Sequence, residues 1–185
     1  IVPKNFLPHT NEFYEARWFA SGVDISKDVS SVNLFGEDIA FGKIIFETSN
    51  GEVNFAAEIC ADLWAPISPN ERLYSNGALI CFNLSASPAH VGKKELRKTL
   101  TKSISLKFNG GYVYVSNNSS ESTSEVVFSG HKLICENGEV ISENEEISLH
   151  SDIIYGDFDI LKLHHARRNN SYFKNVQEMA RDLHI

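Results

Sequence analysis

The sequence has little positive charge, few cysteines and no long hydrophobic run. Its 185 residues include 17 lysines and arginines against 24 acidic residues, which gives a net charge of −7. Because the basic residues are not gathered into a stripe, we do not expect a nucleic-acid partner held through its phosphates. No apolar run approaches the length of a membrane span and no signal peptide is visible, so we expect no membrane partner either.

The three cysteines are an odd set without the spacing of a disulfide framework. They indicate free thiols in a reducing compartment, and we expect a cytoplasmic protein. His164 and His165 are adjacent and would point in different directions on a helix, and no cysteine–histidine spacing suits zinc. We therefore expect no metal site.

Hydrophobic residues make up 42% of the chain and charged residues 22%, as in a globular protein that can build one sizeable core. We predict a single domain over residues 1–185. The chain begins Ile1-Val2-Pro3-Lys4, without a methionine and inside an apolar segment. This start favours a piece of a longer protein whose N-terminal portion is absent.

Short apolar runs separated by turn residues predict a sheet. Asn50-Gly51 and Asn137-Gly138 lie between such runs, and Asn-Gly favours the positive φ of tight hairpin turns. The run at 78–84 is apolar on both faces, as expected for a strand covered on both sides. The predicted strands are 39–47, 53–60, 78–84, 112–116, 125–135 and 152–159.

Amphipathic segments between these runs predict helices at 12–19, 91–108 and 174–183. Strands mixed with helices indicate a layered α/β architecture. The second helix has an apolar stripe that consists of Val91, Leu96, Leu100, Ile104 and Phe108.

The stretch EICADLW places Cys60 where an apolar run ends. Buried thiols are mostly inert packing, and Cys81 and Cys135 fit that interpretation because both lie inside apolar runs. Cys60 differs because it lies at a strand-to-loop edge, where α/β sheets present reacting groups. Lys4 also ends an apolar segment. Such a lysine is usually a solvated charge, but beside a thiol it would favour the thiolate and stabilise an oxyanion.

Four motifs in order carry a resemblance to a known family. They are PKNFLPHTNEFYE (3–15), EICADLW (58–64), NLSAS (83–87) and SESTSE (120–125). The segments FGKIIF, GYVY, FSGHKLICENG and HHARRN agree as well. On these motifs the chain resembles the glutaminase domain of glutamine-dependent NAD synthetase, a branch of the nitrilase-like carbon–nitrogen hydrolases. The resemblance implies an α/β fold, the central and C-terminal portion of a nitrilase-type α-β-β-α sandwich.

The resemblance also implies a cysteine amidohydrolase with a Glu-Lys-Cys triad. Cys60 would be the nucleophile that attacks the side-chain amide of glutamine, giving a γ-glutamyl thioester and ammonia. Lys4 and the backbone N–H of Ala61 would hold the tetrahedral oxyanion. The family's glutamate, the general base, lies N-terminal to the lysine strand and has no counterpart here. The isolated segment is therefore expected to be inactive.

By the same resemblance, glutamine would be bound by Thr10, Ser87 and Lys93, with Lys93 facing the α-carboxylate as a point charge. Simpler alternatives stay open for two of these residues. Ser87 precedes Pro88 and could cap the following helix. Lys93 could be a solvated helix charge.

Two further residues complete the implied substrate site. Glu15 would brace Lys4 or face the amino group of glutamine, and Trp64 would form an apolar wall, unless it is only core. The chain departs from the family pattern at Thr10, where the family has tyrosine, and at Ala61, where it has glutamate. Both lie near the expected substrate, so they bear on affinity or specificity for glutamine.

The implied function is release of ammonia from glutamine for a synthetase domain of the same protein, which makes NAD from deamidated NAD and ATP. No S-G-G-x-D-S loop occurs here. We therefore expect no cofactor in this segment, and ATP and magnesium in the synthetase domain. Two alternatives remain: a free-standing amidase or nitrilase acting on another amide, and a non-catalytic degenerate hydrolase module.

The resemblance further implies a homo-oligomer, because nitrilase-like domains pair across a two-fold axis and so bury strands that would otherwise be exposed edges. We expect residues from about Phe158 onward to contribute contacts outside their own core.

Overall fold

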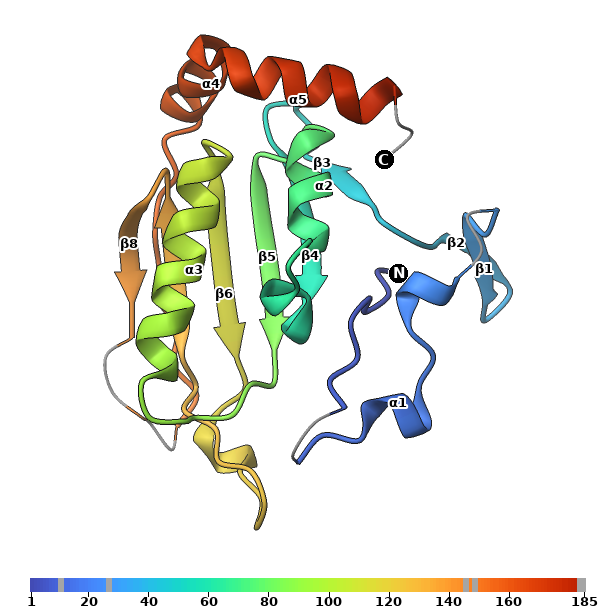
Figure 1. Ribbon diagram of the computed structural model, residues 1–185, viewed down its shortest axis with the longest axis vertical. Coiled ribbons are helices and arrows are strands. Elements are labelled where there is room, and N and C mark those ends of the chain that lie inside the picture. Colours follow the sequence, from blue (N-terminus) through green and yellow to red (C-terminus); the bar gives the residue numbers. More distant parts are fainter. Residues whose placement is uncertain (10–11, 26–27, 145–146, 148–149, 183–185) are drawn as a thin grey trace.

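The protein is described here by a computed structural model that covers residues 1–9, 12–25, 28–144, 147 and 150–182. A six-stranded sheet with strand order β3-β4-β5-β6-β7-β8 forms its centre, with helices packed on one face (Figure 1). The layered α/β architecture predicted from the sequence is confirmed. The strands are β3 (Ile45–Glu47), β4 (Asn54–Ile59), β5 (Ile80–Ser85), β6 (Gly111–Ser116), β7 (Lys132–Glu136) and β8 (Glu139–Glu143).

The three middle strands β4, β5 and β6 run parallel, whereas β3, β7 and β8 pair antiparallel at the edges. Parallel neighbours need crossover connections, and helices α2 (Pro69–Ser75) and α3 (Lys93–Lys107) supply them. β5 has a parallel partner on each side, which confirms the interpretation of 78–84 as a central strand. The carboxyl ends of β4, β5 and β6 meet at one edge of the sheet.

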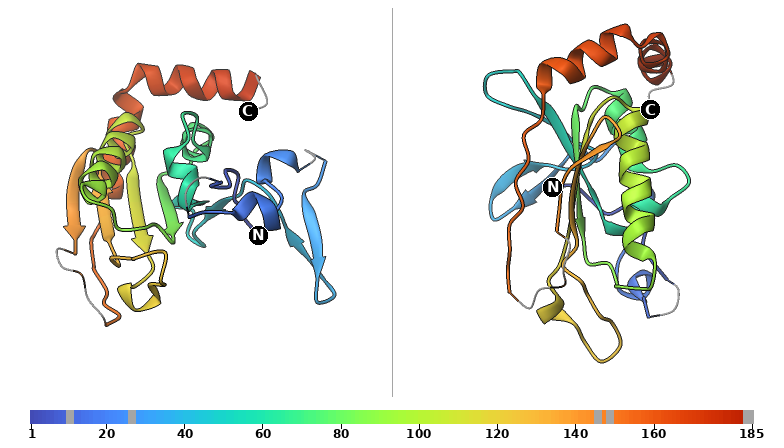
Figure 2. Two further views of the ribbon diagram at one scale, coloured as in Figure 1. Left: turned by 60° about the horizontal axis from the view of Figure 1, so that its bottom comes forward. Right: turned by 90° about the vertical axis from the view of Figure 1, so that its left-hand side faces the viewer.

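The main core lies between the sheet and helices α2 and α3, and includes Ala56, Cys81, Tyr112 and Leu133, none of which is exposed. Residues 150–159 run along the opposite face without joining the sheet (Figure 2). Phe158 covers Gly111 so closely that a Cβ atom there would lie 2.5 Å from its ring. A side chain at position 111 would therefore force the Phe158 ring to shift.

Helices α4 (Ile160–Asn169) and α5 (Ser171–Asp182) lie across the end of the sheet where β5 and β6 begin (Figure 1). Leu163 and Phe173 are buried in the two hydrophobic clusters. The segment after Phe158 thus contributes to the core of its own chain, and its contacts to other subunits stay a prediction. None of the described helices has the length and apolar character needed to cross a membrane.

Shorter elements complete the described fold. A separate hairpin of β1 (Ser31–Leu34) and β2 (Glu37–Ala40) lies on the N-terminal side. The remaining elements are α1 (Glu15–Trp18) and the 3₁₀ turns η1 (Gly22–Asp24), η2 (Cys60–Trp64) and η3 (Ser119–Glu121).

Both predicted hairpins are confirmed, since Asn137 and Gly138 adopt φ of 46° and 91° between β7 and β8, and Gly51 has φ of 71° between β3 and β4. The strand predicted at 152–159 is wrong. The strand predicted at 39–47 is interrupted at 41–44. Of the strand predicted at 125–135, only residues 132–135 lie in a strand, β7.

The predicted helices differ in extent. α1 has only four residues, α5 begins before residue 174, and α2 and α4 were not predicted. In α3 the predicted stripe is only partly buried: Phe108 is in the core and Leu100 and Ile104 pack against it, but Val91 and Leu96 are exposed.

Candidate active site

Cys60 directly follows β4 and begins the turn η2, so its thiol lies at the edge where the parallel strands end. Its φ is +52°, in the left-handed region that non-glycine residues rarely adopt. Such a conformation costs free energy, and residues that adopt it occur preferentially at functional sites. The Cys60 Sγ lies 3.8 Å from the carbonyl oxygen of Ala86, just after β5. Cys60 is partly exposed, whereas Cys81 and Cys135 are buried and free, as the packing interpretation predicts for them.

Asp62 joins the Cys60 turn to the segment that contains Lys4. Its fully buried carboxylate accepts hydrogen bonds from the backbone N–H groups of Phe6 at 2.8 Å, Asn5 at 3.1 Å and Ile59 at 3.1 Å. Burial raises the pKa of Asp62, and the N–H donors partly oppose this shift. One acid therefore fixes the residues directly after Lys4 and the residue directly before Cys60 in a single arrangement.

Lys4 pairs with Glu15: the Nζ to Oε2 distance is 2.5 Å, and the side chains are 16% and 27% exposed. This geometry matches a bracing contact of Glu15 on Lys4, the first of the two roles considered for it. The approach of Lys4 Nζ to Cys60 Sγ stays a prediction.

Beneath the turn lies a second buried acid, Glu58, which is fully buried on β4. It accepts hydrogen bonds from Ser68 Oγ at 2.8 Å, Asn70 Nδ2 at 3.0 Å and Asn83 Nδ2 at 3.3 Å, and also from the Tyr112 hydroxyl. Burial raises the pKa of Glu58, with these donors opposing the shift.

Asn83 Nδ2 also donates to the carbonyl oxygen of Cys60 at 3.4 Å. The hydrogen bonds around Glu58 therefore extend to the backbone of the η2 turn. Sequence reasoning missed both Glu58 and Asp62. The signal that could have found them is an acid on each side of Cys60 inside a run that is otherwise largely apolar.

Lys93 begins α3, and its Nζ lies 5.5 Å from the centre of the Trp64 ring, a cation–π arrangement. Burial lowers the pKa of Lys93, as does the charge of Arg97, while Cys60 and Glu12 oppose the shift. Lys93 is therefore partly buried beside the Trp64 ring, which argues against a merely solvated charge. Trp64 is 39% exposed, so it is not simply a core residue.

Ser87 does not cap a helix, because α3 begins at Lys93 with Gly92 as its N-cap. Instead it is 3% exposed, and its Oγ accepts a hydrogen bond from Arg97 at 3.1 Å. Ala61 follows Cys60 in η2, and Thr10 lies outside the described residues. No group of three His, Cys, Asp or Glu side chains that could hold a metal ion occurs in the described part of the chain.

We compared the sequence and the fold with those of known proteins. No family model matches the sequence. Over 185 residues the chain is 31% identical to a glutamine-dependent NAD(+) synthetase of Mycobacterium tuberculosis, an alignment that covers 99% of this chain and 27% of that protein. The crystal structure of a glutamine-dependent NAD(+) synthetase from Cytophaga hutchinsonii matches with a TM-score of 0.65 at 26% identity, over 80% of this chain and 23% of that one.

A carbon–nitrogen hydrolase from Helicobacter pylori matches in fold with a TM-score of 0.65 at 18% identity, over 89% of this chain and 53% of that one. The chain thus has the fold of the nitrilase-type carbon–nitrogen hydrolases, as predicted. Within that class its sequence is similar to a part of the glutamine-dependent NAD(+) synthetases. It spans about a quarter of the length of the curated relatives that it matches, at 27%.

Proposed function

We propose that this chain hydrolyses the side-chain amide of glutamine and that the ammonia serves a synthetase domain of the same protein, which amidates deamido-NAD at the expense of ATP. The observation that carries the proposal is the joint placement of Cys60 and the Lys4–Glu15 pair by the buried carboxylate of Asp62. The match along the whole chain to glutamine-dependent NAD(+) synthetases supports it.

In the proposed reaction, the Cys60 thiolate attacks the amide carbon of glutamine and forms a tetrahedral oxyanion. Lys4, oriented by Glu15, and the backbone N–H of Ala61 stabilise that oxyanion by hydrogen bonding. The carbon–nitrogen bond then breaks, the nitrogen leaves as ammonia after taking up a proton, and a γ-glutamyl thioester remains. Water cleaves the thioester, releasing glutamate and restoring the thiol.

The proton of Cys60 requires a general base. The resemblance assigns that role to a glutamate N-terminal to Lys4, which has no counterpart in residues 1–185. We expect residues 1–185 alone to release little or no ammonia from glutamine, and the complete protein to release it.

The charged end of glutamine would be bound near the start of α3. Lys93 carries the positive charge that the α-carboxylate needs, and the Trp64 ring beside it provides an apolar wall. The loop at Ser87 borders the same space through its neighbour Ala86, whose carbonyl contacts the thiol. Thr10 completes the proposed set of substrate contacts.

The decisive experiment replaces Cys60 in the complete protein and supplies either glutamine or ammonium. Cys60→Ala should abolish glutamine hydrolysis and glutamine-dependent NAD formation, while NAD formation from ammonium continues, because free ammonia bypasses the covalent step. Cys135→Ala is the matched control, since that thiol is buried against Thr101. It should retain glutamine hydrolysis. Full glutamine-dependent activity in Cys60→Ala would contradict the proposal.

A further inference from the structure

Arg97 is a buried arginine on α3, with only 1% of its surface exposed. Its Nη2 donates to the carbonyl oxygens of Pro88 at 2.7 Å and Ser87 at 3.3 Å, and to Ser87 Oγ at 3.1 Å. The guanidinium also lies 5.6 Å from the centre of the Tyr114 ring. A buried guanidinium is costly unless its donors are used. Here one nitrogen directs three contacts to a single loop, residues 86–88.

This loop is also the wall of the thiol site. Its first residue, Ala86, provides the carbonyl oxygen that lies 3.8 Å from Cys60 Sγ. A shift of the loop would therefore change both the accessibility of the thiol and the groups that surround it.

Two further contacts hold the same loop. The Ser87 N–H donates to Ser116 Oγ at 3.2 Å, and Pro88 forms an isolated β-bridge with Phe128. Arg97 differs from these contacts because its Nη2 alone reaches the carbonyl oxygens of both Ser87 and Pro88, while its buried Nε has no hydrogen-bond partner among the described residues.

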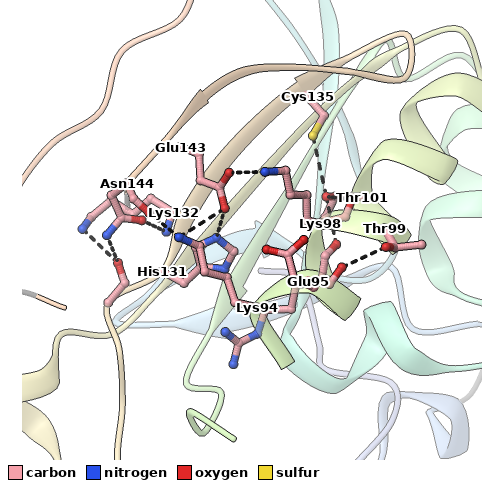
Figure 3. A network of polar contacts seen from close by, with 12 residues as sticks. Lys94, Glu95, Lys98, Thr99, Thr101, His131, Lys132, Cys135, Glu143 and Asn144 are labelled. Atoms are coloured by element: carbon pink, nitrogen blue, oxygen red, sulfur yellow. Dashed lines mark hydrogen bonds and ion pairs between the residues drawn. The ribbon is translucent and has the colours of Figure 1, made fainter. Parts of the chain in front are cut away.

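Two other cations of α3, Lys94 and Lys98, are held by the carboxylate of Glu143. Glu143 accepts from Lys98 at 2.7 Å, pairs with Lys94 at 3.5 Å and contacts His131 Nε2 at 3.1 Å (Figure 3). The described hydrogen bonds of Arg97 all end on the 86–88 loop. Within the part of the chain that the structure describes, Arg97 forms no ion pair, and its hydrogen bonds hold that loop.

We propose that Arg97 is a positioning residue for the Cys60 site: its buried guanidinium fixes the 86–88 loop against the thiol and so sets the geometry in which the thiol reacts. The proposal rests on the proposed function, in which Cys60 is the nucleophile. Arg97 does not contact substrate; it acts through Ala86 and Ser87.

Arg167 offers a matched control within the same chain. It is partly buried, and it donates to the carbonyl oxygens of Ala78 at 2.6 Å, Phe108 at 3.1 Å and Asn109 at 3.1 Å. These carbonyls precede β5 and β6, at the end of the sheet opposite to Cys60. Both arginines therefore hold backbone carbonyls, but among the described contacts only those of Arg97 hold the loop whose Ala86 carbonyl lies beside the thiol.

The test compares Arg97→Met and Arg167→Met in the complete protein. Both should lower the melting temperature. Only Arg97→Met should make alkylation of Cys60 by iodoacetamide several-fold faster, measured on the Cys60 peptide by mass spectrometry, because a released loop exposes the thiol. It should also lower kcat/KM for glutamine on the order of 100-fold, mainly through kcat, as expected for a misplaced reacting group. Arg97→Lys should restore part of both readouts.

Wild-type alkylation and kcat/KM in Arg97→Met, or equal changes in both arginine variants, would overturn the proposal. If Arg97→Met does not fold, Ser116→Ala removes a single contact to the same loop and should shift both readouts in the same direction by less. No shift in Ser116→Ala would then overturn the proposal. The alkylation rate needs no glutamine, so it tests the loop even if Cys60→Ala shows that the proposed function is wrong.

Discussion

The carboxylate of Asp62 accepts a hydrogen bond from the backbone N–H of Phe6 at 2.8 Å, across 56 residues of sequence. The same carboxylate holds Ile59, the residue before Cys60. Asp62 is therefore the link that brings the Lys4 segment to the turn of the thiol, although it takes no part in the proposed chemistry.

Asp62→Ala should lower the free energy of unfolding by about 3 kcal/mol or more, because it leaves several buried N–H groups without an acceptor. Asp38→Ala is the control, since Asp38 is exposed and its carboxylate accepts a hydrogen bond from Asn33 in the same hairpin. It should change stability by no more than about 0.5 kcal/mol. Urea unfolding of both variants checks this, and equal losses would contradict the role of Asp62.

The sequence predicted the position of Cys60 at a strand end but not the acids that place it. Glu58 faces the helices from β4 and Asp62 lies in a 3₁₀ turn, so their burial depends on partners that are distant in sequence. Tyr112 and Phe6, for example, are 54 and 56 residues away from these acids. Local patterns carry no information on such contacts.

In the fold, too, features set by neighbouring residues were predicted, whereas features that depend on distant contacts were not. The Asn137-Gly138 hairpin was predictable because its backbone conformation is encoded by two residues. The segment 152–159 was mistaken for a strand because its apolar residues pack over the sheet instead of pairing with it, as Phe158 does on Gly111. In α3 the buried face carries Thr101, whose hydroxyl bonds to the carbonyl of Arg97 and so is satisfied without water.

Lys4→Ala should reduce kcat/KM for glutamine by a factor corresponding to roughly 3 kcal/mol or more, since it removes a donor to the oxyanion. Its effect on the free energy of unfolding should be small, because the Lys4–Glu15 pair is partly exposed. Lys174→Ala, on the exposed side of α5, should leave both quantities unchanged. Steady-state kinetics with glutamine and with ammonium separate the two steps, and unchanged glutamine kinetics in Lys4→Ala would exclude the oxyanion role.

If Lys93 binds the α-carboxylate as proposed, the affinity for glutamine should depend on pH. Burial lowers its pKa below the usual 10.5, so it loses its charge at a lower pH than a solvated lysine does. KM for glutamine should therefore rise as the pH is raised through this lowered pKa. In Lys93→Arg the guanidinium stays charged, so the part of the rise that is due to this residue should disappear. Identical pH profiles of KM in the two proteins would rule out Lys93 as the carboxylate partner.

His131 makes stability depend on pH in the acid range. Burial lowers the pKa of His131 in the folded protein, although the hydrogen bond to Glu143 opposes this. Below about pH 6.5 the unfolded chain binds a proton that the folded chain binds less readily, so the free energy of unfolding falls as the pH drops. The slope from one such group is at most about 1.4 kcal/mol per pH unit.

His131→Gln should remove this part of the pH dependence between pH 7.5 and 5.5 in urea unfolding. His164→Gln, at an exposed position on α4, should retain it. The comparison between variants cancels the contributions of Glu58 and Asp62, which titrate alike in both proteins. A His131→Gln protein with the wild-type pH dependence would show that His131 does not carry the effect.

The central claim, that Cys60 attacks glutamine, is tested most directly by covalent labelling of the complete protein with a diazoketone analogue of glutamine. The account predicts one equivalent of label on the peptide that contains Cys60, blocked by excess glutamine, with Cys81 and Cys135 unlabelled. An unlabelled Cys60 in a protein that still hydrolyses glutamine, or a label on another residue, would contradict it.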